Sequence, residues 1–165
     1  MEGVVGRKIR CVWRVWPLIC GFLLVSAGSL AAQSNITVDR VLAEPNLTYG
    51  SAAYLALVAA QEISPDSSPR EAFDTLRRLG PEPSDRIRAG DEIALGAYAH
   101  ILMERLGFRG GLLYRIAPGP RYAARWLQRT RIVEPPALPG MRLSGARALR
   151  ILERAARYRE GERLW

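Results

Sequence analysis

Apolar residues recur at helical spacing in three stretches of the chain, and each stretch begins beside a glycine. The stretches cover residues 47–60, 93–106 and 143–156. The glycines that mark their starts are Gly50, Gly96 and Gly145. Because these glycines lie 46 and 49 residues apart, the pattern predicts an array of similar helical units.

Local signals around the first two stretches define the helices more closely. Residues 48–63 are apolar nearly all round, which predicts a helix buried by several neighbours. Ser68, Pro69 and Glu71 then have the spacing of an N-cap, a first helical proline and a capping box. Gly80 and Pro81 stop this pattern, so the sequence predicts a second helix over 69–79.

The rest of the chain alternates helical patterns with loops rich in glycine and proline. Further helices are predicted over 91–106, 121–132 and 145–159, the last with Ser144 as its N-cap. Residues 108–120 are expected to form a loop with a short helical or extended piece at 112–116. No stretch alternates with period two, so the fold class is predicted to be all-α. We expect a compact array of helix-loop-helix repeats with roughly five main helices.

The N-terminus has the layout of a secretory signal peptide. A basic start precedes an apolar run and then small residues, so residues 1–32 are predicted to be a signal segment cleaved after Ala31 or Ala32. The alternative is an uncleaved anchor through residues 15–32. Residues 33–46 are expected to be an extended lead-in, 47–159 the helical repeat domain and 160–165 a C-terminal tail.

Both cysteines, Cys11 and Cys20, fall inside the predicted signal segment. Cleavage would leave a mature chain without cysteine, which excludes disulfides, thiolate metal sites and a thiol nucleophile. The exported domain would then depend on packing alone. We therefore predict localisation outside the cytoplasm, in the periplasm or the cell envelope.

Charge is distributed unevenly between the two halves of the predicted domain. Residues 33–105 carry 7 arginines against 11 acidic residues, whereas residues 106–165 carry 13 arginines against 4 glutamates. A C-terminal half this basic indicates an anionic surface or polymer as partner. Ordinary solvation of helix faces is the alternative.

Few residues suggest catalysis. His100 is the only histidine, so a zinc site or a histidine-dependent triad has little support. Asp91 and Glu92, with Asp85, precede a helix, where carboxylates ordinarily interact with the helix dipole. We predict that the protein is not an enzyme and that it holds no metal and no cofactor.

The strongest binding candidate is a cluster on the helix predicted over 121–132, formed by Arg121, Tyr122, Arg125 and Trp126. Guanidinium groups make bidentate contacts with carboxylate or phosphate, and an aromatic face can stack on a sugar ring. Alternatively, Tyr122 and Trp126 belong to the core and the arginines are merely solvated. Nucleic acid would suit the same chemistry, but an exported chain rarely meets it.

The order of helices resembles the S-layer homology (SLH) repeat of bacterial envelope proteins. In that family a first helix ends in a glycine-marked loop, and a second, alanine- and leucine-rich helix follows. Residues 70–80 with 92–107 resemble one such unit, 121–133 with 142–155 the next, and 47–60 the second helix of an earlier, truncated unit. Where the family has a Thr-Arg-Ala-Glu-like motif, this chain has TYGS, ALGA and LSGA.

The resemblance, which covers roughly residues 47–157, implies a non-enzymatic envelope protein. Its expected ligand is an anionic cell-wall polymer or peptidoglycan, bound through the arginine-rich half. The alternative is a helical adaptor or scaffold that binds an envelope protein. Membrane contact is expected only through residues 15–32, if the signal is not cleaved.

Overall fold

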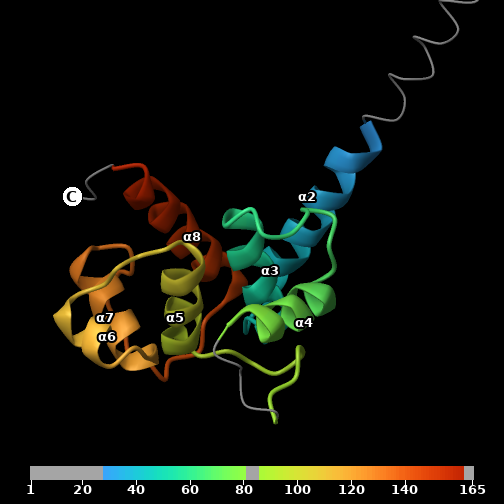
Figure 1. Cartoon of the computed structure of the whole chain (residues 1–165). Helices are drawn as coiled ribbons and strands as arrows, with labels where there is room; N and C mark the ends of the chain where they lie inside the picture. Colours follow the sequence, from blue (N-terminus) through green and yellow to red (C-terminus); the bar gives the residue numbers. More distant parts are fainter. Residues whose placement is uncertain (1–27, 81–85, 162–165) are drawn as a thin grey trace, which may run out of the picture.

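A computed structural model describes residues 28–80 and 86–161, with side chains from residue 36 onward. Seven helices and no strand occur within these ranges, which confirms the all-α prediction (Figure 1). The helices are α2 (Gly28–Ala43), α3 (Tyr49–Ala59), α4 (Pro69–Leu79), α5 (Leu95–Arg105), α6 (Leu112–Ile116), α7 (Pro120–Arg129) and α8 (Gly145–Arg159). None of the described helices has both the length and the hydrophobicity that a bilayer crossing requires.

The helix starts with clear capping signals lie where the sequence predicts. Ser68 caps α4, its hydroxyl accepts from the Glu71 amide, and the Glu71 carboxylate accepts from the Ser68 amide. This reciprocal capping box satisfies amides that have no partner inside the helix. Ser144 caps α8 in the same way through the Arg147 amide.

The segment predicted to be an extended lead-in is largely helical, because α2 runs to Ala43. Its polar sequence gives little helical signal by itself. Val41 is nevertheless buried, and α2 packs against α8, so tertiary contact stabilises this helix. The predicted signal segment lies outside the described residues for positions 1–27, and the tail does so for 162–165.

Three further helices are shorter than the apolar pattern predicts, and one of them, α7, ends at Arg129 rather than at residue 132. Helix α5 starts at Leu95 rather than near residue 91, because residues before it form bridges with other segments. Helix α3 ends at Ala59, and Gln61 then adopts a left-handed backbone with φ of 62°. The start of α5 is therefore set by backbone contacts with other segments, and α3 ends at a turn of the chain.

Three short segments precede α3, α5 and α8 and are here called their leads: residues 44–48, 89–94 and 139–144. The leads hydrogen-bond to one another in a closed ring. The Leu47 amide donates to the Leu143 carbonyl, and the Ile93 amide donates to the Leu47 carbonyl. Isolated antiparallel bridges pair Thr48 with Glu92 and the lead into α5 with the lead into α8. Backbone groups that a loop would otherwise leave unpaired are satisfied between segments far apart in sequence.

The three glycines are the positions where these backbones approach most closely. The amides of the glycines donate to carbonyls of the next segment in the ring, as Gly50 to Ala89 and Gly96 to Pro139, both at 2.8 Å, and Gly145 to Glu44 at 3.0 Å. A β-carbon at Gly145 would overlap the Val41 carbonyl, and one at Gly96 would lie 2.9 Å from the Pro139 carbonyl oxygen. Only glycine fits such an approach.

Helix packing follows the same cyclic order. Helix α3 packs on α4, α5 packs on α7, and α8 packs on α2, so each of the three glycine-led helices has its own partner among the other helices (Figure 1). One core fills the centre, and the fully buried Tyr98 hydroxyl donates to the Ala148 carbonyl at 3.1 Å. Burial raises the pKa of Tyr98, so this donor stays protonated.

We expect Gly145→Ala to destabilise the protein by about 3 kcal/mol or more, because its methyl group would overlap backbone rather than a mobile side chain. Gly140→Ala is the matched control: no atom lies within 4 Å of the place that its methyl group would take, and its cost should stay within about 0.5 kcal/mol. Urea unfolding followed by circular dichroism measures both. Equal stabilities would contradict the close approach in the ring.

Candidate binding surface

The four residues of the predicted binding cluster lie on α7 and divide by burial. Arg121 and Arg125 are exposed, whereas Tyr122 and Trp126 are half-buried and pack against the core. Pro120 starts the helix at a position where its missing amide proton costs nothing. The structure therefore brings the four residues together but presents mainly the guanidinium groups to solvent.

Trp126 has a structural contact that its spacing from Tyr122 does not reveal. Its ring centroid lies 5.4 Å from that of Phe108 and 5.6 Å from that of Tyr158. Phe108 and Tyr158 also meet edge to face, at 5.8 Å. These distances are typical of favourable aromatic pairs, so the three rings fasten α7 to α8 and to the loop after α5.

A small cavity of about 100 Å³ lies between α6 and α7. Its lining is mostly apolar and is formed by Gly111, Leu112, Leu113, Tyr114, Tyr122, Arg125, Trp126 and Arg129. Three of the four predicted residues therefore reach this cavity, with Arg125 and Arg129 adding charge beside apolar walls. The cavity can admit a small apolar group or the edge of a ring.

Residues 107–133, here called the α6–α7 segment, contain six arginines and no acidic residue. All six are exposed, and none forms an ion pair with another described residue. They are Arg109, Arg115, Arg121, Arg125, Arg129 and Arg131. The sequence prediction named only two of them as site residues, although the absence of acid across this segment is visible in the sequence alone.

The arginines of α8 differ from these six, because several of them are bound by other parts of the chain. Arg147 donates to the carbonyls of Glu134 and Pro136 at 3.0 and 2.6 Å, and Arg154 pairs with the Glu134 carboxylate. This hydrogen bond and the charge of Arg154 lower the pKa of Glu134 below its ordinary value of 4.5. These arginines therefore fix the proline-rich loop and contribute less free charge.

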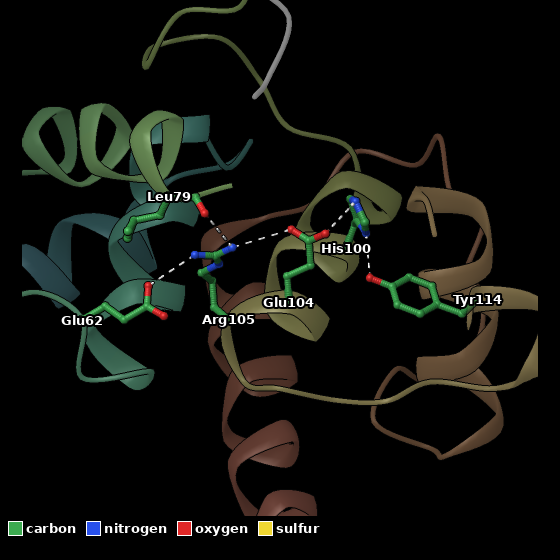
Figure 2. A network of polar contacts seen from close by, with 6 residues as sticks. All are labelled: Glu62, Leu79, His100, Glu104, Arg105 and Tyr114. Atoms are coloured by element: carbon green, nitrogen blue, oxygen red, sulfur yellow. Dashed lines mark hydrogen bonds and ion pairs between the residues drawn. The ribbon is translucent and has the colours of Figure 1, made fainter. Parts of the chain in front are cut away.

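A polar network joins the region around α3 and α4 to α5 (Figure 2). The Arg105 guanidinium lies 3.5 Å from the Glu62 carboxylate, 3.9 Å from the Glu104 carboxylate and 3.5 Å from the Leu79 carbonyl oxygen. Its side chain is only 12% exposed, so these contacts offset the cost of removing a charge from water. Arg105 is therefore a structural cation, unlike the arginines of the α6–α7 segment.

His100 continues this network toward α6 (Figure 2). Its Nε2 lies 3.4 Å from the Glu104 carboxylate, and its Nδ1 lies 2.9 Å from the Tyr114 hydroxyl. Burial, with a smaller effect of the Glu104 charge, raises the pKa of Tyr114 to about 12. The protonated phenol thus holds α6 on α5, which gives the lone histidine a structural role.

The carboxylates near the start of α5 also have structural partners. Asp91 accepts from the Arg88 amide at 2.8 Å. Glu92 accepts from Asn46 at 2.8 Å and pairs with Arg142 at 3.3 Å, which ties together all three leads of the ring. Asp85 lies outside the described residues. The described part of the chain has no group of three or more His, Cys, Asp or Glu placed to hold a metal ion.

No protein-family model, curated protein or solved structure matches this chain.

Replacing Arg105 by lysine should lower the free energy of unfolding by about 1–2 kcal/mol, because one ammonium cannot reach Glu62 and Leu79 together as the planar guanidinium does. Arg129→Lys, at an exposed position without an ion pair, should change it by less than about 0.5 kcal/mol. Chemical denaturation compares the two. If Arg105→Lys leaves the free energy of unfolding unchanged, the network adds no stability.

The Glu134 carboxylate should titrate below 4.5, and Arg154→Gln should move its pKa back toward that value. Because the folded-state pKa is the lowered one, the contact stabilises the fold above the unfolded pKa and is lost as pH falls through the folded pKa. Carboxyl carbon chemical shifts followed by NMR measure both values. An unchanged pKa in the variant would exclude Arg154 as the cause.

Proposed function

We propose that this protein is an exported, non-enzymatic envelope protein that binds an anionic cell-wall polymer through the α6–α7 segment. The observation that carries the proposal is the set of six exposed arginines that no described acidic residue neutralises. A surface of this kind attracts polyanions and repels cations. The paired arginines elsewhere in the chain lack this free charge.

The spacing on α7 suits a ligand with repeated negative charges. Arg121, Arg125 and Arg129 follow one another at intervals of four residues, which places them about 6 Å apart along the helix axis. Each guanidinium can hold a phosphate or carboxylate by two parallel hydrogen bonds. Tyr122 and Trp126 border the neighbouring cavity and offer ring edges to a sugar unit.

The position of the surface in the molecule supports the same function. Helices α6 and α7 lie at the end of the domain opposite the start of α2 (Figure 1). A large polymer can therefore approach this end of the domain without contacting the start of α2.

The ring of three leads supports the likeness to SLH domains, which is part of this proposal. We infer that α2 with α3, α4 with α5 and α7 with α8 form three helix-loop-helix units. The cyclic hydrogen bonds of Gly50, Gly96 and Gly145 support this assignment, because equivalent positions make equivalent contacts. The α2–α3 pair would supply the first unit, which the sequence alone suggested was truncated.

Arg125→Glu should weaken binding to purified peptidoglycan carrying its anionic polymers by roughly three- to ten-fold, because charge reversal replaces an attraction with a repulsion. Thermal stability should stay nearly unchanged, since Arg125 is exposed. Arg70→Glu, at an exposed position on α4, is the matched charge-reversal control and should bind like wild type. Co-sedimentation at increasing salt measures the affinity.

Wild-type binding should fall as salt rises, because salt screens exposed charges. Salt-insensitive binding, or equal effects of the two substitutions, would contradict the polymer proposal. Capture of an envelope protein without polymer binding would support the adaptor alternative instead.

A further inference from the structure

Helix α6 presents a patch of large apolar side chains to solvent. The exposed fractions are 70% for Leu112, 48% for Leu113 and 73% for Ile116. Single exposed apolar residues are ordinary, but three on one five-residue helix are an unusual concentration that calls for a partner. Tyr114 alone points inward and is buried against the core.

The positive charges around this patch favour a partner that carries negative charge. Arg109 and Arg115 are exposed beside it, and Arg125 and Arg129 line the cavity that Leu112 and Leu113 also line. A second copy of the chain is disfavoured, because a symmetric contact would bring these cations against their own equivalents. The patch therefore requires a partner that is apolar and anionic at once.

The shape of the patch favours a fluid partner over a folded one. Helix α6 is only about 7.5 Å long, whereas a stable protein interface buries about 800 Å² on each side. The adjoining cavity, at about 100 Å³, is too small to receive a partner helix. Side chains that project from a short convex helix can instead enter an acyl layer without any preformed groove.

We propose that α6 seats the domain on an anionic lipid bilayer. Leu112, Leu113 and Ile116 enter the boundary between headgroups and acyl chains, and the flanking arginines bind the lipid phosphates. The contact of Tyr114 with His100 holds α6 on the domain while its apolar side chains are in the bilayer. This inference rests on the proposed function for the exported location, and it adds lipid to the polymer as a second anionic partner of the α6–α7 segment.

The test is backbone amide exchange of the full chain, measured by mass spectrometry over residues 109–117. The chain is mixed with vesicles of phosphatidylglycerol, which is anionic, or of phosphatidylcholine, which is not. Phosphatidylglycerol should slow the exchange by about ten-fold or more, and phosphatidylcholine should leave it nearly unchanged. A peptide-resolved readout separates α6 from any contact that residues 15–32 make with the vesicles.

A variant with Leu112→Ser, Leu113→Ser and Ile116→Ser should lose this protection and unfold at the wild-type temperature. Leu138→Ser, at a position 67% exposed outside α6, should keep the protection. The inference is overturned if the anionic vesicles leave α6 unchanged or if the triple variant stays protected. It is also overturned if protein concentration alone slows the exchange, which would indicate a second copy.

The two proposals can fail separately. If Arg125→Glu leaves polymer binding intact while α6 is protected by anionic lipid, the polymer proposal fails and the lipid contact stands. If polymer binding falls as expected and α6 exchanges freely, the lipid contact fails and the polymer proposal stands.

Discussion

The fold depends on the close approach of backbones where the leads into α3, α5 and α8 meet. Helices usually associate through side chains, but here amides and carbonyls from three distant segments pair directly. At Gly96 and Gly145 the backbones approach so closely that no β-carbon would fit. Because each lead bonds to another and the order closes on itself, a shift of one lead would leave buried polar groups unpaired in the next. The ring therefore fixes where all three glycine-led helices begin and in which direction they run.

The α6–α7 segment carries its positive charge on one side and contributes to the core with the other. Its six exposed arginines form no ion pair with a described residue, so they repel one another. The inner side belongs to the core, because α7 packs on α5, Trp126 packs with Phe108 and Tyr158, and Tyr114 bonds to His100. These contacts hold the segment in place, so its outer side can carry charge without disturbing the core.

The helices that could be predicted from the sequence are those whose signals are local. Ser68, Pro69 and Glu71 determine the start of α4 through contacts within one turn, and Ser144 does the same for α8. The start of α5 could not be found in this way, because residues 91–94 are taken into bridges with segments about 45 residues away in either direction. Helix α2 was missed for a related reason: its sequence is a weak helix former, and its packing on α8 lies far along the chain. Contacts between segments far apart in the sequence therefore determine both the start of α5 and the formation of α2.

The same division between local and non-local information separates the arginines. In the sequence all arginines contribute equally to the total charge, which does not show which of them are available to a partner. Arg105, Arg147 and Arg154 are bound by carboxylates or carbonyls from other segments, so they act as structural cations. Those of the α6–α7 segment are separated from every described acid, because the chain has none between Glu104 and Glu134 and the fold brings none alongside. Availability, rather than number, is what distinguishes the arginines of this segment and supports the proposal that it binds an anion. The exposed apolar side chains of α6, in the same segment, support a partner that is not purely polar.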